Sequence, residues 1–459
     1  MEKLIKYKQK FENLKYKDWI ILTILFLIAL VLRLYLINTN LFFGPEQGRD
    51  LLVVKDIVLS WKIVLIGPRT AVDGIFHGPF YYYLAVIPFL LSKGSPVFIA
   101  YFFIFINSLS VFFGYLLGKE LFNRRVGLIT AFLFTFSFGA IVMSRWLSHP
   151  PLIIPISCLF FLFLAKFIKG KNYYLILTAI LLGLSGQVEF TNYLLFGFIL
   201  FLILVIFKKR IKEQKPILLL VSLSVLVFSS ISNYILFDVR HDFLISKGFI
   251  KLFTKGSGYY GTIVNSITSS IDSFVKIASD TVFPLHSISA IVIVFLGLFF
   301  VVKKTQGRIG KPVVLIWLIA PFLVFTLIKY NALYHYFAFI IVGLLLVLAV
   351  LIDRIWDNKK IAAPGLLAIL TIVNLFTWYT YLPTNNRVFF QSTQPELKYR
   401  DQIMVVKEIY KIANGKPFYF QTYTIPYWLQ QEWEYLFWYY GKNVYGYLPA
   451  HTNKGTLFV

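Results

Sequence analysis

The chain has 459 residues, of which 58% are hydrophobic and 19% aromatic, and its mean hydropathy is +0.73. These values exceed those of a soluble globular domain of this length and exclude water as its main solvent. The formal charge of +24 does not indicate a nucleic-acid binder, because Lys and Arg are concentrated in short segments between apolar runs. The sequence therefore predicts a membrane protein and no nucleic-acid partner.

Apolar runs long enough to cross a membrane recur along the chain. A helix needs roughly 17 to 25 apolar residues to cross about 30 Å of hydrocarbon, and about eleven runs approach that length. The first run lacks a small-residue cleavage site, which predicts a retained signal anchor. The expected fold class is mainly α, a polytopic transmembrane helical bundle with outer juxtamembrane helices. The expected spans cover residues 19–37, 96–118, 126–146, 151–168, 172–188, 191–207, 217–236, 287–302, 312–328, 333–352 and 361–381.

Clusters of Lys and Arg set the expected orientation. Short basic loops stay in the cytoplasm, and the N-terminus goes with them. Residues 80–91 are apolar but too short for a span, and counting them as one would put the basic cluster at 123–125 outside. We therefore interpret them as a juxtamembrane helix. The clusters that become cytoplasmic lie at residues 3–17, 119–125, 166–171, 208–215, 303–311 and 354–360.

This orientation gathers three long polar segments on the outer face of the cytoplasmic membrane. Residues 38–95 form the first outer loop and residues 237–286 the second. We expect residues 1–381 to form a multi-pass transmembrane domain and residues 382–459 a small α/β domain on the outer face. The two halves show none of the similarity that common transporters carry. Long outer loops are what an enzyme needs to build a site above the membrane.

The first outer loop contains the motif Gly-Pro-Glu-Gln-Gly-Arg-Asp at residues 44–50. In a helix that begins at Glu46, the carboxylates of Glu46 and Asp50 lie one turn apart on one face. A carboxylate there can take a proton from an acceptor hydroxyl and activate it as a nucleophile. The simpler alternative is that Pro45 and Glu46 only start an interfacial helix, since both are favoured in a first turn.

Basic side chains recur at the predicted outer ends of other segments. His77 precedes Gly-Pro at the start of the juxtamembrane helix, where a helix N-terminus beside a histidine can bind an anion, although the motif alone is only a turn signal. Arg240 follows the seventh span, where a guanidinium can bind a phosphate group in a bidentate manner. His335 begins the tenth span. For Arg240 and His335 the alternative is an interfacial anchor.

Two further patterns are set aside. Residues 256–261 match a dinucleotide-binding fingerprint by letter, but no buried strand precedes them, and we interpret them as a flexible loop. The sequence contains no Asp-x-Asp, His-Glu-x-x-His or Cys-x-x-Cys motif, so it predicts no metal site and no cofactor.

Three motifs, taken in order, resemble those of the C-type glycosyltransferase superfamily. They are the acidic motif after the first span, the basic-Pro-aromatic motif at residues 77–83, and Ser-Arg-Trp-Leu-Ser-His-Pro-Pro at residues 144–151. The resemblance covers roughly residues 15–340. It is closest to the bacterial branch related to protein O-mannosyltransferases and aminoarabinose transferases.

The resemblance implies transfer of a sugar from a polyprenyl-phosphate donor to an acceptor at the outer membrane face, with inversion. The acceptor is a lipid, a glycan or a protein, and membrane lipids surround the spans. By position, the resemblance makes Glu46 the catalytic base and gives His77 and Arg145 as candidate ligands of the donor phosphate. The residues themselves, by spacing and predicted location, add Asp50 as the second catalytic candidate and Arg240 and His335 as further candidate ligands of that phosphate.

The chain departs from the family pattern at two places. Gln47 stands where a second acid is usual, and Ser148 or His149 occupies the position after Arg145 that is often Asp. Glu189, at another predicted outer helix end, is a candidate for the missing charge. His149 is likewise a candidate for an additional acid or an acceptor contact.

Two other function classes remain open from the sequence. A lipid or polysaccharide flippase needs no base, but it would line a path through the spans with Arg or Lys, which the sequence does not show. An envelope scaffold would bind a partner through the C-terminal tail, and deletion of residues 385–459 would then remove all function.

Overall fold

The structure is a computed structural model. It describes residues 2–70, 74–255, 262–304, 309–381, 398–422, 429–450 and 454–459. Within these residues the chain is almost entirely helical, which confirms the expected mainly α fold class. Residues 256–261, interpreted above as a flexible loop, lie outside the described residues.

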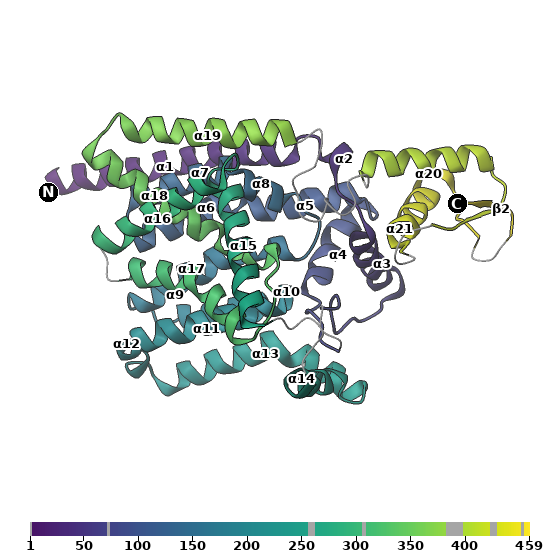
Figure 1. Ribbon diagram of the computed structural model, residues 1–459, viewed down its shortest axis with the longest axis horizontal. Helices are drawn as coiled ribbons and strands as arrows, with labels where there is room; N and C mark the ends of the chain where they lie inside the picture. The colour runs from purple at the N-terminus through teal and green to yellow at the C-terminus, as the bar shows by residue number, and fades with distance from the viewer. Residues whose placement is uncertain are drawn as a thin grey trace.

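The helices follow one another with short connections (Figure 1). Their bounds, in chain order, are α1 Glu2–Leu34, α2 Ile37–Asn40, α3 Pro45–Ser60, α4 Phe80–Ser92, α5 Pro96–Ser108, α6 Ser110–Leu121, α7 Arg124–Phe136, α8 Phe138–Ser144, η1 Pro150–Leu152, α9 Ile153–Ile168, α10 Tyr174–Val188, α11 Phe190–Ile206, α12 Lys208–Lys212, α13 Pro216–Arg240, α14 Leu244–Lys255, α15 Ile263–Val282, α16 Ser287–Lys304, α17 Gly310–Leu327, η2 Tyr334–Ile340, α18 Ile341–Asn358 and α19 Ala362–Tyr381. The core lies around α18, which packs against α7, α15 and α16.

Every apolar run that was expected to span the membrane falls in helix. Seven segments of the described chain are long and apolar enough to cross a membrane, or nine if each of two bent helix pairs is one span. The runs at 172–188 and 191–207 are α10 and α11, whose 15 and 17 residues are short for a span. The difference from the expected count therefore comes from two short helices and two bent ones. The 13 residues of α4 agree with the expected juxtamembrane helix in length.

The chain bends by 62° between α7 and α8, at Ser137. A helix that ends leaves its last carbonyl groups without partners in the helix. Here Arg33 of α1, which is fully buried, donates hydrogen bonds to the carbonyl oxygens of Phe134 (2.9 Å) and Thr135 (3.3 Å). A charge inside a span is expensive unless it is paired in this way. The arginine thus stabilises the bend, and the chain that follows α8 leads into the candidate site.

The segment expected as the second outer loop contains α15, a 20-residue helix that packs against α16, α17 and α18. Its buried face carries Ser266, Ser270 and Ile277. The small serines pack closely and satisfy their own hydroxyl groups: Ser270 Oγ donates to the carbonyl oxygen of Ser266 (2.7 Å). Serine lowers the hydropathy of a helix, so the sequence predicted a polar loop where the structure has a packed helix.

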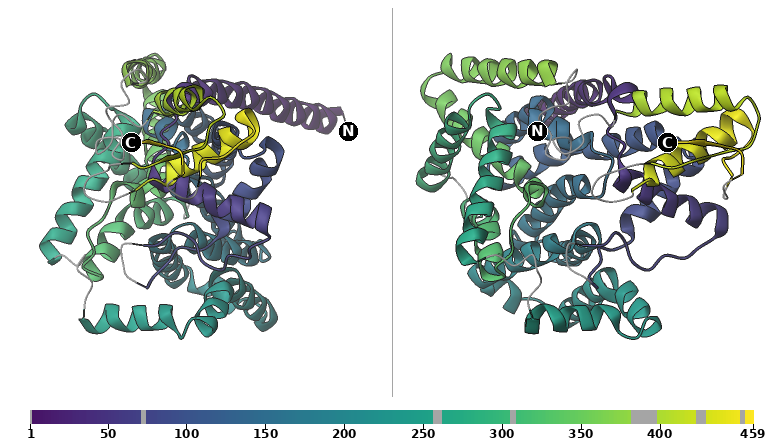
Figure 2. Two further views of the ribbon diagram at one scale, coloured as in Figure 1. Left: turned by 90° about the vertical axis from the view of Figure 1, so that its right-hand side faces the viewer. Right: turned by 45° about the vertical axis from the view of Figure 1, so that its right-hand side comes forward.

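The last described residues form the expected small α/β unit. It consists of α20 Tyr399–Ala413, β1 Phe418–Phe420, α21 Gln431–Tyr440, the π-helical turn η3 Gly441–Tyr445 and β2 Thr456–Phe458. The two strands are parallel, with Phe418 opposite Thr456. Figure 1 shows this unit, in yellow, at the end opposite the N-terminus. Both views of Figure 2 show it against the segment of α2 and α3, where α20 contacts α2 and α21 contacts α3.

Gly48 of α3 permits the closest of these contacts. A Cβ atom at Gly48 would lie 2.2 Å from the backbone nitrogen of Glu432 in α21, so something would have to move. We expect Gly48→Ala to loosen the C-terminal unit from α3 and to speed its cleavage in limited proteolysis of the purified full chain. Gly365→Ala, at a position with open space around it, is the matched control. Identical cleavage rates in the two variants would contradict this close docking.

Candidate active site

The first two turns of α3 carry two carboxylates, Glu46 and Asp50, that differ in their exposure to solvent. Gly44 is the N-cap, Pro45 follows as the first helical residue, and the N–H of Gly44 donates to Gln47 Oε1 (3.0 Å). Gln47, which stands where a second acid was expected, thus stabilises the helix start. Glu46 is exposed in the first turn, whereas Asp50, one turn later, is 1% exposed.

Asp50 is enclosed by groups of its own chain. Its Oδ1 atom accepts hydrogen bonds from Arg49 Nε (2.9 Å) and from the hydroxyl group of Tyr82 in α4 (3.1 Å). Burial raises the pKa of the Asp50 carboxyl to about 6, although the neighbouring Arg49 guanidinium opposes the shift. Asp50 can therefore orient Arg49 and Tyr82 but is not open to a substrate.

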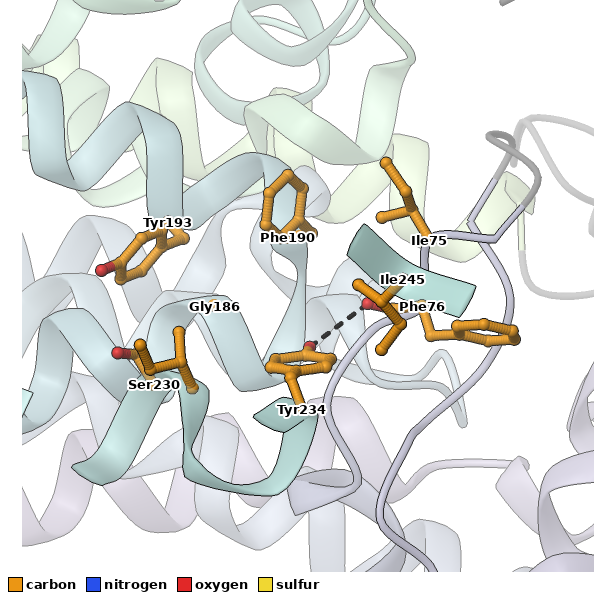
Figure 3. Close-up of a pocket in the computed structure, with 9 residues that line it drawn as sticks. Ile75, Phe76, Gly186, Phe190, Tyr193, Ser230, Tyr234 and Ile245 are labelled. Carbon is orange, nitrogen blue, oxygen red and sulfur yellow. Dashed lines mark hydrogen bonds between the residues drawn. The ribbon is translucent and has the colours of Figure 1, made fainter. Parts of the chain in front are cut away.

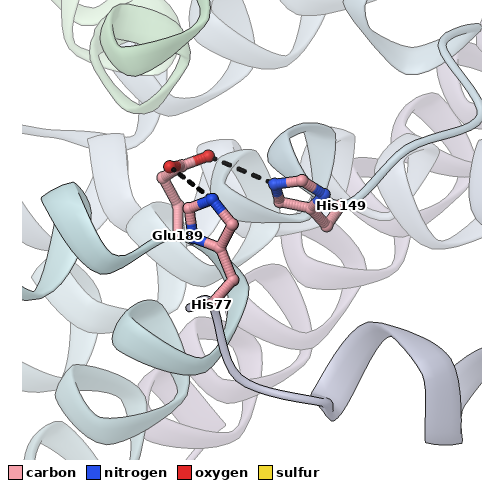
Figure 4. A group of neighbouring side chains, drawn as sticks. All are labelled: His77, His149 and Glu189. Atoms are coloured by element: carbon pink, nitrogen blue, oxygen red, sulfur yellow. Dashed lines mark ion pairs between the residues drawn. The ribbon is translucent and has the colours of Figure 1, made fainter. Parts of the chain in front are cut away.

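Glu189 lies between two histidines that come from different loops (Figure 4). His77 Nε2 is 3.4 Å from Glu189 Oε1, and His149 Nε2 is 3.4 Å from Glu189 Oε2. The N–H of Phe190 donates to His77 Nδ1 (3.2 Å), which places the ring proton of neutral His77 on Nε2, facing Glu189. Burial lowers the pKa of His77 to about 4 and that of His149 to about 3. Both rings are therefore neutral at pH 7.

Three loops build this cluster. His77 precedes α4, His149 precedes η1, and Glu189 occupies the break between α10 and α11. The ligand-type atoms of the three side chains all lie within 4.8 Å of one another, a spacing that suits a metal ion. No motif in the sequence indicated such a cluster, since the residues are far apart along the chain.

Arg49 connects the acidic helix with the histidines. Its positive charge acts on His77 and His149 and lowers the pKa of both, while Asp50 and Glu46 raise the pKa of Arg49. Its side chain is 39% exposed, so one end is open to a ligand. The sequence analysis did not select Arg49. Its position in the acidic motif, next to Asp50, was the available signal.

The other predicted phosphate ligands differ in how close they lie to the cluster. His335 joins the cluster, because it lies close enough to His77, His149 and Glu189 for their charges to interact. Its ring also lies 5.8 Å from that of Trp146. Arg145 Nη1 instead donates to the carbonyl oxygens of Arg33 (2.7 Å) and Tyr35 (2.8 Å) near the end of α1.

Arg240 is exposed at the C-terminal end of α13. Within the described ranges, no hydrogen bond or ion pair joins it to the histidines or to Glu189. The structure therefore brings together His77, His149, Glu189 and His335, and it relates Glu46 and Asp50 to them only through Arg49. Arg145 is held by carbonyl groups near the end of α1, and Arg240 is not brought into contact with the cluster.

The chain neighbours of the cluster line an apolar cavity of about 110 Å³, whose residues Figure 3 shows. Phe76 and Phe190, the chain neighbours of His77 and Glu189, form part of its wall. Tyr234 of α13 closes another side, and its hydroxyl group donates to the carbonyl oxygen of Phe76 (3.2 Å). The consecutive pairs Phe76–His77 and Glu189–Phe190 thus each place an aromatic ring in the cavity wall and a polar side chain in the cluster.

Gln187 packs against the loop of His77, a contact that the sequence analysis missed. Its Nε2 atom donates to Asn233 Oδ1 (2.7 Å) and to the carbonyl oxygen of Ser230 (2.8 Å), both in α13. A Cβ atom at Gly78 would lie 1.9 Å from Gln187 Oε1, so the loop approaches this closely only because residue 78 is glycine. The available signal was a Gln two residues before Glu189 at a helix end.

Comparisons with known proteins point to one superfamily. The sequence model of a family described as dolichyl-phosphate-mannose-protein mannosyltransferase matches residues 76–234. No curated protein matches the sequence. The structure is similar to that of ArnT from Cupriavidus metallidurans bound to undecaprenyl phosphate, with a TM-score of 0.62 and 12% identity over 95% of this chain and 89% of that chain. It is similar to the same protein in the apo state, with a TM-score of 0.63 and 11% identity over 95% and 90% of the two chains.

A more distant likeness is to AglB, the oligosaccharyltransferase of Archaeoglobus fulgidus, in complex with an inhibitory peptide and a dolichol-phosphate. The TM-score is 0.50 at 14% identity, and the match covers 92% of this chain and 64% of that chain. At such identities the likeness shows the fold. Together with the family matched over residues 76–234, this fold is consistent with the C-type glycosyltransferase superfamily, and the apolar helices support a multi-pass membrane protein.

Proposed function

We propose that the protein transfers a sugar from a polyprenyl-phosphate donor to an acceptor hydroxyl group at the outer face of the cytoplasmic membrane. The observation that carries this proposal is the wall shared by the apolar cavity and the histidine–glutamate cluster. A polyprenyl-phosphate sugar has an apolar chain and a polar end, and adjoining apolar and polar compartments match it. ArnT with undecaprenyl phosphate and AglB with a dolichol-phosphate, which have similar folds, support this class of donor.

The proposed reaction is a direct displacement. The Glu46 carboxylate takes the proton of the acceptor hydroxyl, and the acceptor oxygen attacks the anomeric carbon of the sugar. The bond from that carbon to the phosphate oxygen breaks, polyprenyl phosphate leaves with the electron pair, and the configuration inverts. Glu46 suits the base because it is exposed at the start of α3, whereas Asp50 is enclosed.

Arg49 is the residue that we assign to the departing phosphate. Its guanidinium is oriented by Asp50, is partly exposed, and lies close enough to His77 and His149 to act on both. A preorganised cation lowers the barrier when it faces charge that develops in the transition state. The outer location follows from the basic clusters between the spans, which favour a cytoplasmic location for those loops.

The test is an assay of the purified full chain in liposomes. Synthetic polyprenyl-phosphate sugars are supplied with lipid, glycan and peptide acceptors in parallel, and the products are measured by mass spectrometry. We expect free polyprenyl phosphate and one glycosylated acceptor class, both dependent on the protein. Movement of the intact donor across the bilayer without its cleavage would overturn the proposal in favour of a flippase.

A further inference from the structure

Two helix breaks inside the bundle lie against each other. The chain bends by 62° between α7 and α8 and by 86° between α15 and α16. At the first bend, the hydroxyl group of Ser137 donates to the carbonyl oxygen of Thr281 (2.8 Å), near the end of α15. A Cβ atom at Gly139, in the first turn of α8, would lie 2.9 Å from the carbonyl carbon of Asp280. Ser137, Gly139 and the last turn of α15 thus form a joint between the two breaks.

Asn374 of α19 bonds to both sides of this joint. Its Oδ1 atom accepts the N–H of Phe138 (2.8 Å), the first residue of α8, and its Nδ2 atom donates to the carbonyl oxygen of Val282 (3.3 Å), the last residue of α15. Such groups at helix ends have no partner within their own helix, and inside a membrane they have to be satisfied by protein. Asn374 is 4% exposed, although most of α19 faces outward. Its two partners on two other helices account for an amide in an apolar span.

Each side of the joint leads to a histidine of the candidate site. The loop that carries His149 follows directly after α8. On the other side, three hydrogen bonds from α15 hold residues 332–334, the segment directly before His335. These bonds join Ser269 Oγ to the N–H of Ala332 (3.0 Å), Ser273 Oγ to the carbonyl oxygen of Ala332 (3.0 Å) and Asp280 Oδ2 to the hydroxyl group of Tyr334 (2.9 Å). The two histidines lie close enough for their charges to interact.

We propose that Ser137 and Asn374 are positioning residues of the active site. By joining the start of α8 to the end of α15, they fix the loop of His149 relative to the segment of His335. Both act through the helices that they join. That the two histidines face the polar end of the sugar donor rests on the proposed function, whereas the joint itself does not.

The joint is tested without substrate, by hydrogen exchange of the purified full chain in detergent. Asn374→Leu keeps the size of the side chain and removes both hydrogen bonds. We expect the amides of residues 138–149 and 332–340 to exchange roughly 2- to 10-fold faster in this variant, the factor that the loss of one hydrogen bond produces. A folded Asn374→Leu in which either segment exchanges at the wild-type rate overturns the joint.

Two further variants complete this experiment. Thr371→Val is the matched control: Thr371 also lies on α19, its hydroxyl group donates to the carbonyl oxygen of Leu367 in the same helix (2.8 Å), and both segments should keep the wild-type exchange rate. Ser137→Ala removes the bond to Thr281 and decides the question if Asn374→Leu does not fold. Faster exchange in both segments supports the joint there too, and wild-type exchange overturns it.

Positioning is then separated from stability by kinetics in liposomes. A loss of folded protein lowers the maximal rate and leaves both KM values unchanged. Displaced histidines instead weaken the hold on the donor, so we expect the donor KM to rise about 10-fold in Asn374→Leu while the acceptor KM and the Thr371→Val values stay at the wild-type level. An unchanged donor KM overturns the positioning role. A wild-type chain that transfers no sugar removes the proposed function, and the exchange rates still decide whether the joint exists.

Discussion

Glu46→Gln is expected to lower the rate of sugar transfer by a factor of about 10² to 10⁴, the range that a positioned general base contributes. Glutamine preserves the size of the side chain, and the cap between Gly44 and Gln47 at the start of α3 is untouched. The loss should appear in kcat at saturating donor and acceptor, because the base acts in the transition state and not in substrate binding. Initial rates in liposomes at several substrate concentrations measure it.

Asp56→Asn is the matched control for this variant. Asp56 lies on the same helix, its side chain is 41% exposed, and its carboxylate pairs with Lys55 and Lys62 at 3.6 and 4.0 Å. Exposed pairs of this kind contribute little to stability. We expect Asp56→Asn to keep the wild-type rate. A Glu46→Gln rate within a factor of about three of that control would rule out Glu46 as the base, since a base contributes far more.

The helices were predictable because the length of an apolar run is a local property of the chain. Residues 80–91 were interpreted as a juxtamembrane helix from length and charge alone, and α4 has the expected size. The two bent helix pairs could not be predicted from the length of an apolar run. The bend after α7 depends on Arg33, about a hundred residues earlier, which binds the carbonyl groups that the bend frees. A window of hydropathy cannot detect such a pair.

The candidate site was predictable as a list of residue types but not as a geometry. The spacing of Glu46 and Asp50 predicted one shared face. The structure buries Asp50 under Tyr82 and leaves Glu46 in the open, and that difference depends on where α4 packs. The meeting of His77 with Glu189 depends on the close approach of Gly78 to Gln187. Contacts of this kind are long-range, and a single sequence holds no direct record of them.

Asp50→Asn is expected to lower the rate by roughly 10- to 100-fold, which corresponds to about 1.4 to 2.7 kcal/mol of transition-state stabilisation. The variant keeps the hydrogen bond to Tyr82 but replaces a charged partner of Arg49 by a neutral one. A hydrogen bond between charged groups contributes about 1.5 to 3 kcal/mol, which sets the size of the effect. Arg49 is then free to pair with Glu46, which would also weaken the base. Arg49→Lys should show a similar loss, because lysine cannot reproduce the planar guanidinium.

The titration of Asp50 predicts how the rate of sugar transfer falls on the acidic side of its pH profile. Because burial holds the pKa of the Asp50 carboxyl at about 6, above its ordinary value of 3.8, protonation below about pH 6 removes the ion pair with Arg49 and the rate falls. The fold does not weaken through this group, because a raised carboxyl pKa means that the folded state binds the proton more tightly than the unfolded state. The contribution of Asp50 to stability therefore rises as the pH falls from about 6 towards 3.8. We expect a limb at about pH 6 in the wild-type and Asp56→Asn rates, its absence in Asp50→Asn, and no parallel drop in melting temperature. A limb that persists unchanged in Asp50→Asn would assign the titration to another group and remove Asp50 from the positioning of Arg49.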